Sequence, residues 1–166
     1  TEGIKKMRYW ASQAREPLPY YQHEEIGYNY RLSNVSAGIG RGQLATLDER
    51  VRKKREIYEK YKQAFKDLPV KMMPMLGYSS CWLSAMTFEK PEINVLDVIK
   101  ELDKHGIEAR MVWKPMHLQP IYKDCKYFKH SEDISRQIFE RGICLPSATV
   151  MKDEEQQEVI EIIKKF

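Results

Sequence analysis

Two short segments of the sequence carry the side chains that are best suited to binding a ligand. The first, residues 27–34 (GYNYRLSN), places an amide, a guanidinium and two phenols directly before a predicted helix. The N-terminus of a helix offers unpaired backbone N–H groups and the positive end of a dipole, which favour a phosphate or another anion. Arg31 can add a bidentate contact to that anion. A capped helix preceded by packing tyrosines explains the same residues equally well.

The second segment is residues 110–120 (RMVWKPMHLQP). Its two prolines stiffen the backbone, while the side chains of Trp113, Lys114, His117 and Gln119 offer polar groups. Such a loop suits the binding of a polar ligand. Taken alone, it fits a structural turn with a hydrogen-bonded histidine slightly better.

No other part of the sequence has the spacing of a self-contained catalytic or metal site. It contains no nucleophile elbow around a serine and no phosphate-binding GxxxxGK[ST] loop. The histidines lack the spacing of metal ligands, and the cysteines form no CxxC pair; these residues are His23, His105, His117, His130, Cys81, Cys125 and Cys144. The basic run at 50–55 is flanked by acidic residues spaced for helical ion pairs. It therefore indicates a solvated helix face and no nucleic-acid partner.

The composition restricts the classes of protein to which the chain can belong. The chain has 166 residues, 42% hydrophobic and 31% charged, enough for one domain with a core. A net charge of +4 weakly favours a phosphorylated ligand. No apolar run approaches the roughly 18 residues that span a membrane, and no signal segment opens the chain. The cysteine usage fits a cytoplasmic protein, and because the first residue is Thr1, we expect the natural start to lie upstream.

The hydrophobic patterns predict a small α+β domain that a long helix precedes. We expect the end of a helix at 2–14, a functional loop at 15–33 and the long helix at 34–67, which Ser33 or Asn34 caps. Strands are predicted at 70–75, 81–88, 107–112 and 143–145, helices at 94–104, 131–141 and 152–165, and no regular element at 113–120.

Three glycines stand in the first turns of the long predicted helix, at Gly38, Gly40 and Gly42. Each glycine costs about 1 kcal/mol in a helix interior. Their presence therefore indicates close backbone packing at a subunit contact. The alternative is a helix that begins near Gln43.

Several motifs, taken together and in order, resemble one family. They are ARE at 14–16, GYNYRLSN, the helical GIGRGQL at 38–44, WKPMHLQP at 113–120 and ICLPS at 143–147. This combination is similar to the DegT-type family of pyridoxal-phosphate (PLP)-dependent nucleotide-sugar aminotransferases, and the resemblance covers essentially the whole chain.

The resemblance implies the small C-terminal α+β domain of a fold type I, aspartate-aminotransferase-like enzyme. Residues 1–43 would be the end of the large-domain region and an inter-subunit loop, and residues 44–166 the small domain. Such enzymes are homodimers that transfer an amino group from glutamate to a keto carbon of a nucleotide-linked sugar. The KPMHLQP segment favours a UDP-linked 4-keto sugar.

The resemblance also assigns roles to individual residues. Asn29 resembles the residue that reaches the PLP phosphate of the neighbouring subunit. Arg15 and Arg31 resemble residues that contact the phosphates of the nucleotide sugar across the dimer. The sugar-nucleotide pocket would be lined by His117, Trp113 and Lys114.

The family's cofactor-binding lysine has no counterpart in this sequence. Lys5 and Lys6 stand near the start but lack the surrounding motif. We therefore expect a fragment that is inactive alone and does not bind PLP covalently. Two alternatives stay open: a sugar dehydratase or regulatory protein of the same family, and a stand-alone dimerisation or binding module.

Overall fold

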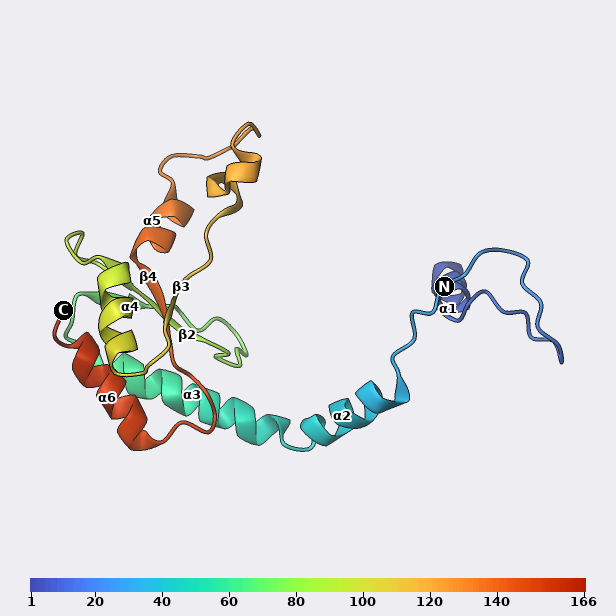
Figure 1. Cartoon of the computed structure of the whole chain (residues 1–166), viewed down its shortest axis with the longest axis horizontal. Coiled ribbons are helices and arrows are strands. Elements are labelled where there is room, and N and C mark those ends of the chain that lie inside the picture. Colours follow the sequence, from blue (N-terminus) through green and yellow to red (C-terminus); the bar gives the residue numbers. More distant parts are fainter. The chain divides into compact units, whose positions relative to one another are not determined.

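Figure 1 shows the computed structural model of the chain, which describes residues 1–166. The chain forms two units, Thr1–Leu47 and Asp48–Phe166. The first unit contains α1 (Glu2–Ala11) and α2 (Asn34–Leu44). Helix α1 ends before the predicted residue 14 because Gln13 and Ala14 adopt positive φ angles of 68° and 51°, which cannot continue a right-handed helix.

The long helix predicted over 34–67 is wrong in one respect, because it is divided into α2 and α3 (Leu47–Ala64). The backbone N–H and the hydroxyl of Thr46 both bond to the carbonyl of Gln43, at 3.2 and 3.3 Å. This i→i−3 pattern tightens the chain into a turn. Helix α2 begins at Asn34 and Ser33 is its cap, accepting a bond from the N–H of Ser36. The alternative of a helix that begins near Gln43 is therefore wrong.

The second unit is built on a four-stranded antiparallel sheet. Its strands are β1 (Val70–Met72), β2 (Ser84–Phe88), β3 (Arg110–Met111) and β4 (Gly142–Leu145), in the spatial order β1-β2-β4-β3. The predicted sequence of elements is confirmed, but β1, β2 and β3 are shorter than predicted. Strand β2 begins late because Cys81 has a φ of 50°, which is not an extended conformation.

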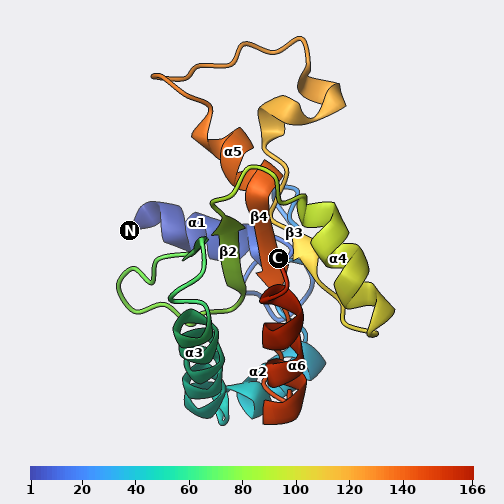
Figure 2. The same cartoon turned by 90° about the vertical axis from the view of Figure 1, so that its left-hand side faces the viewer.

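Three helices, α3, α4 (Val95–Lys104) and α6 (Asp153–Ile163), share one core with the sheet (Figure 2). Asn94 caps α4 by accepting a bond from the N–H of Leu96 at 2.9 Å. Gly106, at a φ of 72°, follows the end of α4. Both the cap and the stop are as the sequence predicts. No helix of the chain is long and apolar enough to cross a membrane.

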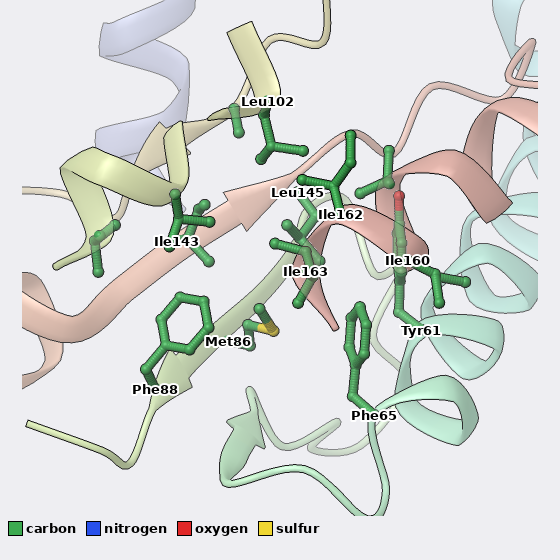
Figure 3. Close-up of a cluster of buried hydrophobic side chains, with 14 of the residues drawn as sticks. Tyr61, Phe65, Met86, Phe88, Leu102, Ile143, Leu145, Ile160, Ile162 and Ile163 are labelled. Atoms are coloured by element: carbon green, nitrogen blue, oxygen red, sulfur yellow. The ribbon is translucent and has the colours of Figure 1, made fainter. Parts of the chain in front are cut away.

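Figure 3 shows side chains of the sheet packed together with side chains of helices α3, α4 and α6. Met86 on β2 and Ile143 on β4 are opposite each other in the sheet, and both are at most 2% exposed. They belong to one cluster with Tyr61 and Phe65 of α3 and Ile160 of α6. Burying each large apolar side chain contributes roughly 1.5–3 kcal/mol, so this cluster is the main source of the unit's stability.

The segment between β3 and α5 (Ile134–Arg141) extends away from the sheet (Figures 1 and 2). We expect no regular element over 113–120, but the structure has two single 3₁₀ turns, η1 (Met116–Leu118) and η2 (Pro120–Tyr122). The same segment carries Cys125, which is exposed; Cys81 and Cys144 are buried, and all three thiols are free.

Candidate functional site

In the first unit, the loop at 15–33 folds back onto the end of α1. The N–H of Gln13 donates to the carbonyl of Tyr28 at 3.0 Å, and the N–H of Tyr28 donates to the carbonyl of Trp10 at 2.7 Å. The carboxylate of Glu25 accepts bonds from Lys6 and from the indole N–H of Trp10. These bonds hold the loop against the helix in a defined conformation.

Gly27 makes this close approach possible. A Cβ atom at this position would lie 2.2 Å from the nitrogen of Ala14 and from the carbonyl carbon of Gln13. Both are backbone atoms, and they have no rotamer with which to avoid the contact. Only glycine therefore fits where the two segments cross.

The crossing of the two segments forms a cavity of about 550 Å³. Its lining includes all three residues to which the family resemblance gives a role in phosphate binding within this unit: Arg15, Asn29 and Arg31. Ser12 forms an antiparallel bridge with Asn29 and accepts a bond from the guanidinium of Arg31 at 3.2 Å. Two guanidiniums, an amide and a hydroxyl thus converge on one cavity.

The charges around the cavity favour an anion. The guanidinium of Arg15 lies over the ring of Tyr21, 4.1 Å from its centroid, which supports the side chain without neutralising it. The one carboxylate on the wall, Glu16, accepts a bond from the hydroxyl of Tyr9 at 2.5 Å. That bond, with burial and the charge of Glu16, raises the pKa of Tyr9 to about 12.

The amides at the N-terminus of α2 do not line this cavity, contrary to the argument from helix dipoles. Ser33 caps α2, because its hydroxyl oxygen accepts a hydrogen bond from the N–H of Ser36 at 3.2 Å. The capped-helix interpretation is correct for Ser33. The two tyrosines, Tyr28 and Tyr30, stack on each other with centroids 5.2 Å apart and are at least half exposed, so they are not core residues of this unit.

The other predicted substrate residues lie close in sequence in the second unit: Trp113 and Lys114 follow β3, and His117 is in η1. The ring of Trp113 packs against that of Trp82, with centroids 6.3 Å apart, although each side chain is about two-thirds exposed. Lys114 is exposed. His117 is largely enclosed, with 15% of its side chain exposed.

A carboxylate that sequence reasoning missed, Asp133, bonds to Nε2 of His117 at 2.8 Å. Tyr127, also missed, stacks on the imidazole with a centroid distance of 3.8 Å and donates its hydroxyl to Asp133 at 3.1 Å. Burial opposes ionisation of Asp133, but the hydrogen bonds that it accepts outweigh burial and hold its pKa well below the usual value. The turn before α5 identifies Asp133 as a cap, but its contact with His117 depends on the tertiary fold.

The side chains of the cavity fit the phosphate of a ligand such as PLP. Amides and guanidiniums are donors that suit phosphate oxygens. No lysine lines the cavity, and Lys6 is paired with Glu25. No three His, Cys, Asp or Glu side chains are grouped so as to hold a metal ion.

The sequence matches the model of the DegT/DnrJ/EryC1/StrS aminotransferase family over residues 1–164. It is 45% identical, over 97% of its length, to EpsN of Bacillus subtilis, provisionally named a pyridoxal phosphate-dependent aminotransferase. It is 33% identical, over 88% of its length, to the GDP-perosamine synthase of Escherichia coli O157:H7. The matches span only 42% and 39% of those two relatives.

The fold of the chain is also found in solved structures. PseC of Helicobacter pylori, an aminotransferase in the biosynthesis of pseudoaminic acid, superposes with a TM-score of 0.81. The superposition covers 99% of this chain and 46% of PseC, at 21% sequence identity. The resemblance that the sequence motifs indicate is thereby confirmed: the chain belongs to the DegT/DnrJ/EryC1/StrS aminotransferase family.

Proposed function

We propose that the chain is the C-terminal part of a PLP-dependent enzyme that transfers an amino group from glutamate to the keto carbon of a nucleotide-linked sugar. The observation that carries this proposal is the convergence of Arg15, Asn29 and Arg31 on one cavity. The family membership supports the reaction class. The chain spans about two fifths of its relatives, which is consistent with further residues, including the cofactor lysine, elsewhere in the full-length protein.

The cavity residues have separate tasks in this proposal. PLP supplies the electron sink that labilises bonds to the amino-bearing carbon. Asn29 donates its amide to the phosphate of PLP in a neighbouring subunit. Arg15 and Arg31 bind the phosphates of the nucleotide sugar, and their side chains are held in place by Tyr21 and Ser12. In the second unit, His117, Trp113 and Lys114 contact the sugar.

A homodimer is part of the proposal, because the cavity residues would serve the neighbouring active site. Helix α2 supports it with exposed apolar side chains: Val35, Ile39 and Leu44 are 75%, 63% and 68% exposed. A Cβ at any of its three glycines would meet nothing within 4 Å, so a partner's backbone has room to approach. Sedimentation of the full-length protein tests this, and a monomer that retains activity refutes it.

The substrate proposed is a UDP-linked 4-keto sugar. The test incubates the full-length protein with PLP, ¹⁵N-glutamate and the UDP-, dTDP- or GDP-linked keto sugar. Incorporation of ¹⁵N into the UDP sugar, identified by mass spectrometry, is expected. Loss of a hydroxyl group without nitrogen incorporation identifies a dehydratase and refutes aminotransfer.

Variants of the cavity test the residue roles. Replacing Arg31 by Gln removes a charged hydrogen bond of about 1.5–3 kcal/mol, so the KM for the nucleotide sugar should rise by about tenfold to hundredfold. Arg41→Gln is the matched control, because Arg41 lies on α2 and off the cavity wall. Asn29→Ala should weaken PLP retention, with Asn34→Ala as its control. Unchanged PLP affinity in Asn29→Ala would refute that role.

A further inference from the structure

The feature that carries a further inference is the carboxylate of Asp133, at the N-terminus of α5. Its Oδ1 accepts the hydroxyls of Tyr127 and Ser135 at 3.1 and 3.0 Å and the N–H of Arg136 at 3.0 Å. Its Oδ2 accepts from Nε2 of His117 at 2.8 Å and from the guanidinium of Arg136 at 3.4 Å. Capping α5 uses only the bond to the Arg136 N–H, so the other contacts exceed what a cap requires.

The bond to His117 fixes where the imidazole carries its proton. A carboxylate that accepts this many hydrogen bonds is ionised, and an ionised carboxylate can only accept. Nε2 of His117 must therefore bear a hydrogen, whether the ring is neutral or charged. In the neutral ring, Nδ1 is then the unprotonated nitrogen.

The position of the ring is fixed as well. Tyr127 stacks on it with an interplanar angle of 6°, so one face is covered, while Asp133 holds one edge. Nδ1 forms no hydrogen bond within the chain and is the polar atom of His117 that is left for another partner. The arrangement aims one edge of the imidazole and keeps the other edge available.

We propose that Asp133 is a positioning residue that presents Nδ1 of His117 as a hydrogen-bond acceptor for a hydroxyl group of the bound nucleotide sugar. This inference rests on the proposed function, in which His117 contacts the sugar. A hydroxyl can donate to an unprotonated nitrogen, whereas an ionised phosphate has no hydrogen to donate. His117 thus recognises a sugar or ribose hydroxyl, and the arginines recognise the phosphates.

The positioning is tested first without substrate, by measuring the ¹⁵N shifts of His117 in the 166-residue chain. The informative variant is Asp133→Ser, because serine caps a helix as well as aspartate does but has no carboxylate to reach His117. We expect a single Nε2–H tautomer in the parent chain and a mixture in Asp133→Ser. Ser135→Ala, which removes another bond to Asp133, should keep the single tautomer. An unchanged tautomer in Asp133→Ser, with α5 intact, refutes the positioning role.

The hydroxyl contact is tested by steady-state kinetics of the full-length aminotransferase. Losing one neutral hydrogen bond should raise the KM for the nucleotide sugar about five- to tenfold in Asp133→Ser. The KM for glutamate should be unchanged, and His117→Ala combined with Asp133→Ser should be no worse than His117→Ala alone. A tautomer change without a change in this KM refutes the hydroxyl contact. A parent enzyme that transfers no amino group refutes the proposed function, and the ¹⁵N result still decides the positioning role.

Discussion

Replacing Gly27 by alanine is the sharpest test of how the first unit builds its cavity. The added Cβ would lie 2.2 Å from two backbone atoms, in Gln13 and Ala14, and 2.6 Å from the carbonyl oxygen of Gln13. Because real Cβ contacts do not occur below about 3 Å, the two crossing segments must separate. The loop and the end of α1 then lose their mutual hydrogen bonds.

The expected magnitude follows from the bonds that the separation breaks. The N–H groups of Gln13, Tyr28 and Tyr30 each donate across the crossing, at 3.0, 2.7 and 3.1 Å. At about 1 kcal/mol each, the crossing loses about 2–3 kcal/mol. This corresponds to a decrease of roughly 30- to 140-fold in the protection of these amides against hydrogen exchange.

The assay is amide hydrogen exchange of the 166-residue chain, which is monitored by NMR. Gly3→Ala is the matched control, because a Cβ at Gly3 in α1 meets nothing within 4 Å. This change should stabilise the helix by up to about 1 kcal/mol. Exchange in the second unit, which has its own core, should not change in either variant. Equal protection of the Tyr28 amide in Gly27→Ala and in the parent chain would refute the steric argument.

Three further predictions concern the second unit and the cofactor. Ser84→Ala should be neutral or slightly stabilising in urea unfolding, because its buried hydroxyl has no partner; Ser147→Ala should cost about 1–2 kcal/mol, because its hydroxyl accepts from the N–H of Ser84. Burial raises the pKa of Tyr61, so the folded state favours the protonated phenol. Its contribution to stability is present below about pH 10 and is lost as the pH rises above that value. Tyr61→Phe should therefore flatten the alkaline fall in melting temperature, and an identical pH profile would contradict this. Borohydride reduction of the chain with PLP should label surface lysines sparsely; one stoichiometrically labelled lysine, mapped by mass spectrometry, would show that the chain binds the cofactor by itself.

Local signals in the sequence predict the second unit well. The apolar spacing over 94–104, the Asn94 cap and Gly106 together specify α4, and the structure has each of them. The pairing of the strands is not a local property. Strand β4 lies between β2 and β3, an order that depends on which faces are buried together.

The boundaries that the sequence misses are set by interactions with distant residues or by unusual backbone angles. No residue near Cys81 in the sequence predicts its positive φ angle. The segment before β2 is held by α3, because Arg55 donates two bonds to the carbonyl of Ser79 and Lys54 donates to the carbonyl of Trp82. Such side-chain contacts override the strand propensity of residues 81–83.

The motifs single out three residues that line the cavity, but they do not predict how the backbone forms it. Arg15, Asn29 and Arg31 all line the cavity, and their assignment to phosphate binding stays a prediction. The backbone amides at the N-terminus of α2, which the helix-dipole argument invokes, do not line the cavity. Gly27 is the residue that allows the approach, and its role becomes visible only when the backbone atoms of Gln13 and Ala14 are in place.

The single exposed thiol of the chain has a practical consequence. Since Cys81 and Cys144 are buried, a maleimide dye should attach to Cys125 without any prior removal of cysteines. The dye would stand on the same extended segment as His117 and Tyr127. Its emission would report in real time on whether that segment moves when a nucleotide sugar is added.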